Sequence, residues 1–158
     1  MANIETSQVK GDTNWGLMLD PDGFIAEGTG DNFFIIKNGV VISPEGRNLL
    51  RGISREYVMK ELCQSLGIHS VEKNIDQYDV YDADEAFMTG TPFCMLPVTS
   101  LNGLKIGNGK VGSVFNSILN EWGQNQNLDI AAQIKSWDLV NKMEKNKSPT
   151  PYSFGDDQ

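Results

Sequence analysis

The chain has 158 residues, of which 39% are hydrophobic and 22% charged, and its formal net charge at pH 7 is −8. This length allows one well-packed domain, and the composition is that of a globular protein. The negative charge argues against a general affinity for nucleic acid or anionic membranes, which favour clustered Lys and Arg. The N-terminus lacks the regions of a signal peptide, and no apolar run approaches the roughly 20 residues of a membrane span. We therefore expect a cytoplasmic protein.

Short strands are predicted in the first third of the chain. Asp20-Pro21-Asp22-Gly23 is a strong turn sequence, and the apolar runs on either side of it predict a hairpin. Asn38-Gly39 separates the apolar runs 33–36 and 40–42. Because a type I′ turn needs positive φ at both central residues, this dipeptide predicts a second hairpin.

Helices become more frequent further along the chain. Ser54 is predicted to cap a helix that ends at Gly67. The pattern then predicts a strand over 71–75, a short helix or turn over 79–85, a strand over 93–98 and two helices over about 114–122 and 130–140. These elements indicate the α+β class, with a domain over residues 1–141 and a loosely ordered polar tail over 142–158. Cys63 and Cys94 lie in apolar patterns, which favours free thiols over a disulfide.

Three short motifs offer functional groups. Glu27 follows an apolar run and precedes a Gly-rich bend, which from position alone is most often an exposed turn residue. Gly52-Ile53-Ser54 opens a helix, where free backbone N–H groups can bind phosphate, although most capped helix starts bind none. Gly90 allows close backbone approach, and Thr91 offers an N–H and a hydroxyl.

Together these motifs resemble those of class IV (fold type IV) pyridoxal-phosphate-dependent aminotransferases of the branched-chain amino acid type. The resemblance covers the cofactor-binding part, from about Trp15 to about Trp122, and rests on five motifs in family order. These are residues 23–34, Gly52-Ile53-Ser54-Arg55, Ala83-Asp84-Glu85, Thr89-Gly90-Thr91-Pro92, and Asn102-Gly103 with Ile106-Gly107. It implies the C-terminal domain of the D-amino acid aminotransferase-like fold.

The resemblance also implies site residues and a cofactor, pyridoxal 5′-phosphate. Glu27 would hold the protonated pyridine nitrogen, and Leu50 would pack on the cofactor ring. The phosphate would be held by Ile53, Ser54, Gly90 and Thr91. Many relatives carry Ala where this chain has Pro92, and the missing N–H removes one donor to a substrate carboxylate.

No lysine of this chain matches the family's Schiff-base lysine, which is expected upstream of Met1. Lys10 is the nearest, but it lies well downstream of that position, and Lys37 lies at a hairpin tip. We therefore assign no catalytic residue and expect a fragment that is inactive in transamination by itself. No metal site is predicted, since Asp82, Asp84 and Glu85 fit a solvated helix start, and His69 fits a surface loop.

The resemblance implies transfer of an amino group between branched-chain L-amino acids and 2-oxoglutarate in a full-length parent, which would be a homodimer. Its partners would be small amino acids and 2-oxo acids, with neither nucleic acid nor membrane. Two alternatives remain open at the level of sequence. One is a non-catalytic module that binds a phosphate-bearing ligand or dimerises. The other is a class IV lyase or a D-amino acid aminotransferase on the same fold.

Overall fold

The computed structural model describes residues 2–9 and 14–143. A five-stranded sheet in the order β5-β4-β3-β6-β7 forms its centre, with two-stranded sheets β1–β2 and β8–β9 beside it. Within the central sheet, β4 and β5 are parallel and the other neighbours are antiparallel. The strands are Leu17–Leu19 (β1), Ile25–Gly28 (β2), Asn32–Lys37 (β3), Val40–Ser43 (β4), Ser70–Glu72 (β5), Glu85–Gly90 (β6), Cys94–Val98 (β7), Ser100–Leu101 (β8) and Leu104–Lys105 (β9).

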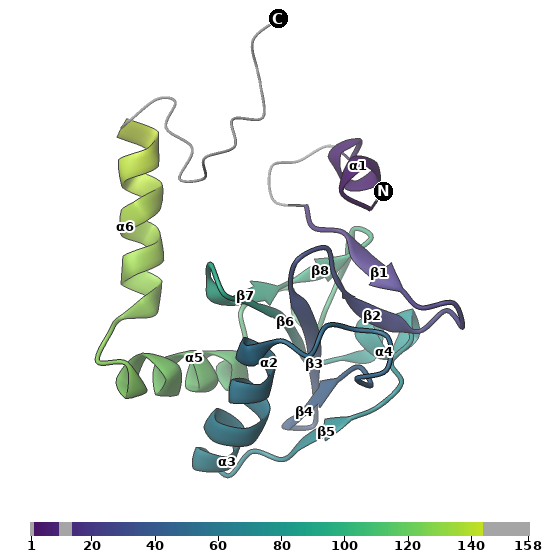
Figure 1. Cartoon of the computed structure of the whole chain (residues 1–158), viewed down its shortest axis with the longest axis horizontal. Helices are drawn as coiled ribbons and strands as arrows, with labels where there is room; N and C mark the ends of the chain where they lie inside the picture. Colours follow the sequence, from purple (N-terminus) through teal and green to yellow (C-terminus); the bar gives the residue numbers. More distant parts are fainter. Residues whose placement is uncertain (1, 10–13, 144–158) are drawn as a thin grey trace, which may run out of the picture.

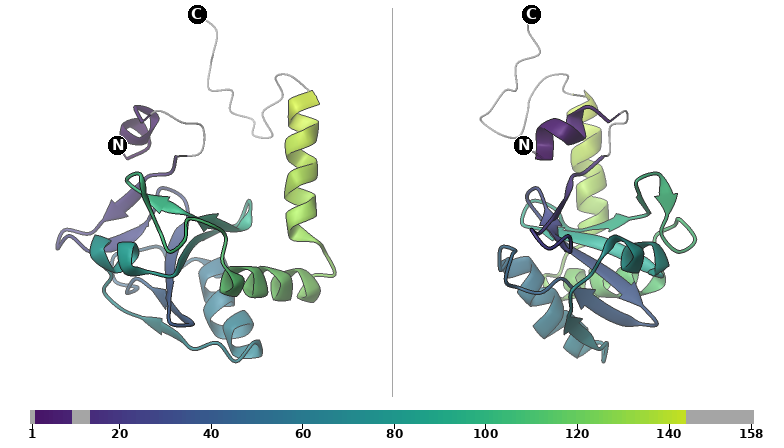
Figure 2. Two further views of the ribbon diagram at one scale, coloured as in Figure 1. Left: turned by 180° about the vertical axis from the view of Figure 1, so that it is seen from behind. Right: turned by 90° about the vertical axis from the view of Figure 1, so that its right-hand side faces the viewer.

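Helices accompany the sheet along the described chain. They are Ala2–Ser7 (α1), Ile53–Tyr57 (α2), the π-helical turn Val58–Leu62 (η1), Cys63–Ser65 (α3), Gln77–Asp82 (α4), Ser113–Asn125 (α5) and Ile130–Met143 (α6). Figures 1 and 2 show α6 projecting away from the sheet beyond the end of α5. The mixture of sheet and helices confirms the predicted α+β class. Among the described residues, none of these helices has both the length and the apolar character of a membrane span.

Strand β3 lies in the middle of the sheet and is buried on both faces. Phe34 stacks on Phe87 of β6 with ring centroids 4.7 Å apart, on the face that also packs against η1, α3 and α5. Phe33 points to the opposite face and packs in a second cluster with Val80 of α4. A central strand covered on both sides needs a continuous apolar run, which explains the Phe33-Phe34-Ile35-Ile36 sequence.

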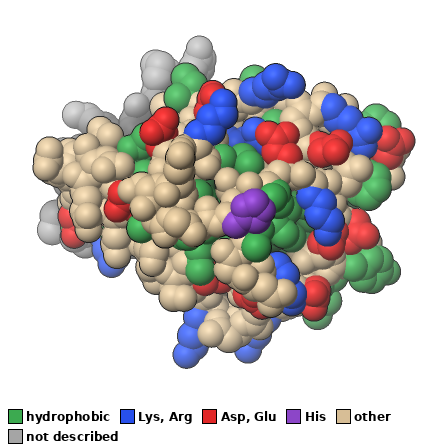
Figure 3. All heavy atoms as spheres, turned by 90° about the horizontal axis from the view of Figure 1, so that it is seen from below, with side chains coloured by type: hydrophobic (Ala, Val, Ile, Leu, Met, Phe, Trp, Pro, Cys, Tyr) green, Lys and Arg blue, Asp and Glu red, His purple; other side chains and the backbone are tan. Residues whose placement is uncertain are grey.

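Several local predictions are confirmed. Asn38 and Gly39 both have positive φ, 50° and 75°, at the tip of the β3–β4 hairpin. Gly67 follows the α2–α3 helix with φ 66°, and both cysteines are free thiols. The single histidine, His69, is exposed, as its position in a loop suggested, and is purple in Figure 3.

Other predictions need correction. The N-cap of α2 is Gly52, which makes no side-chain capping hydrogen bond, so the predicted cap by Ser54 is wrong. Ser54 lies inside the first turn instead, because the chain already adopts helical geometry at Ile53. The strand expected over 71–75 is the shorter β5, and the short helix comes earlier than expected, with Asp76 as its cap. Of the predicted tail, residues 142 and 143 belong to α6 and the remainder lies outside the described residues.

Candidate functional site

Glu27 lies near the end of β2 and is half-buried. One of its carboxylate oxygens, Oε2, accepts hydrogen bonds from the backbone N–H of Leu50 at 3.0 Å and from the Asn32 side-chain amide at 3.0 Å. The same amide nitrogen of Asn32 donates to the Leu50 carbonyl at 2.8 Å. The end of β2, the start of β3 and the loop before α2 are therefore held together around one carboxylate.

Asn32 also positions the start of α2. A Cβ added to Gly52 would come too close to the Asn32 side-chain oxygen, so only glycine fits here. The helix that starts next to this contact presents Ile53 and Ser54 in its first turn. Since Gly52 has no side chain with which to cap the helix, the first backbone N–H groups are available to an anion.

The end of β6 reaches the same edge of the sheet. Thr89 is the register partner of Asn32, and Gly90 follows as the last residue of the strand. The ring of Phe93 lies over Gly90, where an added Cβ would meet its Cζ at 2.8 Å. Thr91 is exposed at the tip, while the Thr89 hydroxyl is buried without a hydrogen-bond partner in the described part of the chain.

The structure thus brings the sequence-predicted residues to one edge of the sheet, some by direct contact and others through intermediate residues. Glu27 and Leu50 are in direct contact. Ile53 and Ser54 are linked to them through Gly52 and Asn32, and Gly90 and Thr91 through the β3–β6 pairing. Figure 1 shows the ends of β2 and β6 and the start of β3 together with α2.

Two highly exposed apolar side chains lie at this edge. Ile53 is 88% exposed and Leu50 is 74% exposed. Isolated apolar side chains are common on protein surfaces, but two beside an anchored carboxylate and a free helix start form a surface suited to an apolar ring that carries a phosphate. This edge therefore combines exposed apolar side chains, an anchored carboxylate, a free helix start and the β6–β7 turn.

The structure adds two residues to this edge. Asn32, which the sequence shows only as part of a motif, connects all three segments. Asp31 was not singled out, yet it is 6% exposed and neither of its carboxyl oxygens makes a hydrogen bond of normal geometry within the described residues. Burial raises the pKa of Asp31 to about 6, the negative charge of Glu27 acts in the same direction, and the Gly30 N–H opposes the rise. No local signal in the sequence distinguishes a buried Asp from an exposed one in a turn.

Arg55 in α2 and Lys37 at the end of β3 are both engaged in ion pairs. Arg55 is 6% exposed, and its guanidinium donates to Ser43 Oγ at 2.8 Å and to the Pro44 carbonyl at 3.2 Å. It also forms an ion pair with Glu72 at 3.1 Å. Lys37 pairs with Asp82 at 3.1 Å at the far end of β3, which agrees with its predicted position away from the site.

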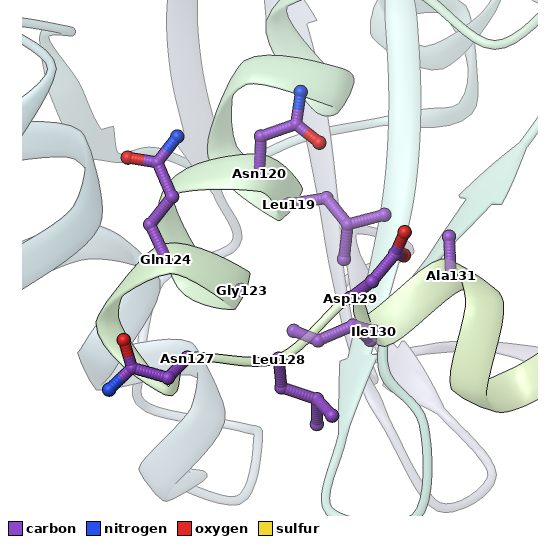
Figure 4. A pocket seen from close by; sticks show the side chains of 9 residues that line it. All are labelled: Leu119, Asn120, Gly123, Gln124, Asn127, Leu128, Asp129, Ile130 and Ala131. Atoms are coloured by element: carbon purple, nitrogen blue, oxygen red, sulfur yellow. The ribbon is translucent and has the colours of Figure 1, made fainter.

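Two surface hollows lie away from this edge. One of about 550 Å³ separates α5 from α6 and is shown in Figure 4. Its lining is mostly aliphatic and amide side chains, with Asp129 as its one ionisable group. Another of about 510 Å³ lies beside η1 and His69. Neither contains Glu27 or the α2 start, so neither offers the groups that the edge assembles.

Comparison with known proteins gives a consistent result. The family model described as amino-transferase class IV matches residues 1–101. A branched-chain-amino-acid aminotransferase of Pseudomonas aeruginosa is 44% identical over 106 residues, which are 67% of this chain and 34% of that protein. A putative branched-chain-amino-acid aminotransferase of Methanocaldococcus jannaschii is 42% identical over 114 residues, or 67% of this chain and 39% of that protein.

Solved structures agree. The branched-chain amino acid aminotransferase from Escherichia coli superposes with a TM-score of 0.70 at 34% identity, covering 77% of this chain and 42% of that one. The pyridoxal-phosphate form of the enzyme from Thermobaculum terrenum gives a TM-score of 0.71 at 27% identity, covering 82% of this chain and 42% of that one. This chain therefore spans well under half the length of the relatives that it matches.

Proposed function

The chain belongs to the class IV aminotransferases, and we propose that it forms the pyridoxal-phosphate-binding part of an enzyme that transfers an amino group between branched-chain L-amino acids and 2-oxoglutarate. The observation that carries the proposal is the anchored carboxylate. Glu27 is fixed by Leu50 and Asn32 on one oxygen, beside an exposed apolar surface and an uncapped helix start.

Each residue of the edge has a role in this proposal. The Glu27 carboxylate would keep a proton on the pyridine nitrogen, and Leu50 would pack against the ring. The N–H groups of Ile53 and Ser54, together with Gly90 and Thr91, would bind the phosphate. When bound, the cofactor supplies an electron sink that makes the Cα–H bond of an amino acid labile. A lysine outside this chain would hold and return the proton at that carbon.

The amino acid class is proposed from the relatives, whose names specify branched-chain amino acids. The 2-oxoglutarate partner is proposed from the resemblance to the family alone. In a longer active protein that contains these residues, leucine or isoleucine should be a better amino donor than D-alanine. Faster turnover of D-alanine would contradict the assignment of the donor class. We also propose that such a protein works as a cytoplasmic homodimer.

The experiment that tests the function mixes the purified chain with pyridoxal phosphate, follows reversible binding by absorbance, and then reduces the mixture with borohydride for peptide mass spectrometry. We expect saturable binding that Glu27→Gln weakens, and no stoichiometric adduct at a single lysine. A stoichiometric adduct on one lysine would show that the chain has its own catalytic amine. Absence of saturable binding would contradict the proposed function itself.

A further inference from the structure

Asp31 is a buried carboxyl group beside the proposed cofactor site. Asp31 lies in the turn between β2 and β3, is 6% exposed, and makes no normal hydrogen bond with either oxygen in the described part of the chain. Its carboxyl group occupies the space where a side chain at Gly28 would begin, directly after Glu27. A buried polar group without partners opposes folding, so this arrangement lowers the stability of the protein.

The charge beside Asp31 has the same sign as its own. Glu27 is the charged group that acts on Asp31, and it has the same sign. Arg55 is turned toward Ser43 and Glu72, and Lys37 toward Asp82, so these two cations are committed elsewhere. Two carboxyl groups of the same sign therefore lie together at the edge where the ligand is proposed to bind. Strained or unpaired groups of this kind concentrate at functional sites.

We propose that Asp31 is a positioning residue of the cofactor site, whose buried negative charge behind Glu27 selects a ligand ring that carries a proton on its nitrogen. This inference rests on the proposed function and extends it from one carboxylate to two. A pyridinium N–H would be bound directly by Glu27, while Asp31 would act on it through the field of its charge. In a partly buried site this field is screened less than in water.

The test compares two ligands that share a phosphate but differ in the ring nitrogen. Pyridoxamine 5′-phosphate has the nitrogen and cannot react with lysine, whereas phenyl phosphate has an apolar ring alone. Their dissociation constants are measured by calorimetry near pH 7.5 for the unchanged chain, Asp31→Asn and Asp22→Asn. Asp22 is exposed in the β1–β2 turn, so its variant is a matched control for the loss of one charge.

We expect Asp31→Asn to weaken binding of pyridoxamine 5′-phosphate by about five-fold, the size of one moderately screened charge interaction. The affinity for phenyl phosphate should be unchanged, and Asp22→Asn should change the affinity for neither ligand. The Asp31→Asn chain should unfold at the same temperature as the unchanged chain or at a higher one. Improved folding together with weaker binding of one ligand is a result that a structural role does not produce.

Three results would overturn the inference. Equal affinities of Asp31→Asn and the unchanged chain for pyridoxamine 5′-phosphate would remove the role of Asp31 and leave the proposed function intact. An equal loss of affinity for both ligands would show that Asp31 only shapes the turn. If the unchanged chain binds neither ligand, the proposed function fails and the role of Asp31 fails with it.

Discussion

At the scale of single residues, two neighbouring carboxyl groups of the site have different hydrogen-bond environments. Glu27 has two donors on one oxygen, from Asn32 and Leu50. Asp31 has none of normal geometry in the described residues. The sequence revealed Glu27 through its place in a motif, but burial depends on which segments cover the turn. The different environments of two acids four positions apart could therefore not be predicted.

The Asp31 carboxyl should make stability depend on pH. Burial raises its pKa from 3.8 to about 6. Because the folded chain then binds this proton more tightly than the unfolded chain, stability from this group is lost as pH rises from about 4 to about 6. Asp31→Asn should increase the free energy of unfolding by about 1–3 kcal/mol near pH 7 and by much less near pH 4. Urea unfolding at several pH values measures this difference.

The exposed Asp22→Asn variant is again the control, and we expect it to follow the unchanged chain at each pH. A gain for Asp31→Asn that is the same at pH 4 and pH 7 would show that the Asp31 proton is bound equally in the folded and unfolded chains.

At the scale of secondary structure, local signals were sufficient for hairpins and helix ends but not for their connections. The Asn38-Gly39 turn is fixed by backbone preferences of the two residues themselves. By contrast, Asn32 reaches Leu50 across 18 positions, and β5 pairs in parallel with β4 after the α2–α3 helix. The Ser54 cap failed because Gly52 packs on Asn32, which places the helix start earlier than a capping serine would.

The contact between Gly52 and Asn32 should be sensitive to one methyl group. The φ of Gly52 is −66°, so alanine is allowed by the backbone and the effect is one of packing. Gly52→Ala should displace Asn32 and lower the free energy of unfolding by about 1–3 kcal/mol. Its affinity for pyridoxamine 5′-phosphate should also fall, because Asn32 fixes Glu27 and Leu50.

Gly46→Ala is the matched control, since an added Cβ would be 3.5 Å from Glu72 Oε2, an ordinary contact. Urea unfolding and calorimetry on both variants check the prediction. Equal stability of the two alanine variants would mean that Asn32 moves at no cost, and the proposed linkage between α2 and Glu27 would then be wrong.

At the scale of the whole molecule, two highly exposed apolar side chains lie at the candidate site. Leu50 and Ile53 lie there with most of their surface in solvent, and α6 projects from the body (Figure 2). The family's motifs predicted that the site residues lie together, but nothing in the sequence predicted how exposed they are. Exposed apolar surface of this kind favours association.

The chain should therefore self-associate through this edge, and sedimentation velocity should detect dimers or larger species. Replacing Leu50 and Ile53 with serine should reduce the associated fraction. Leu104→Ser is a suitable control, since Leu104 is 59% exposed in β9. A monomer at all concentrations would contradict this prediction, and an equal effect of the control would show that the association does not use the candidate site.

The central claim is that the edge formed by β2, β3, β6 and α2 binds pyridoxal phosphate. The most direct test is two-dimensional amide NMR of the 17.5 kDa chain titrated with pyridoxamine 5′-phosphate. We predict saturable shifts that are largest at the amides of Leu50, Ile53, Ser54, Gly90 and Thr91, which lie along this edge. Shifts confined to the hollow between α5 and α6, or no saturable shifts, would contradict the account.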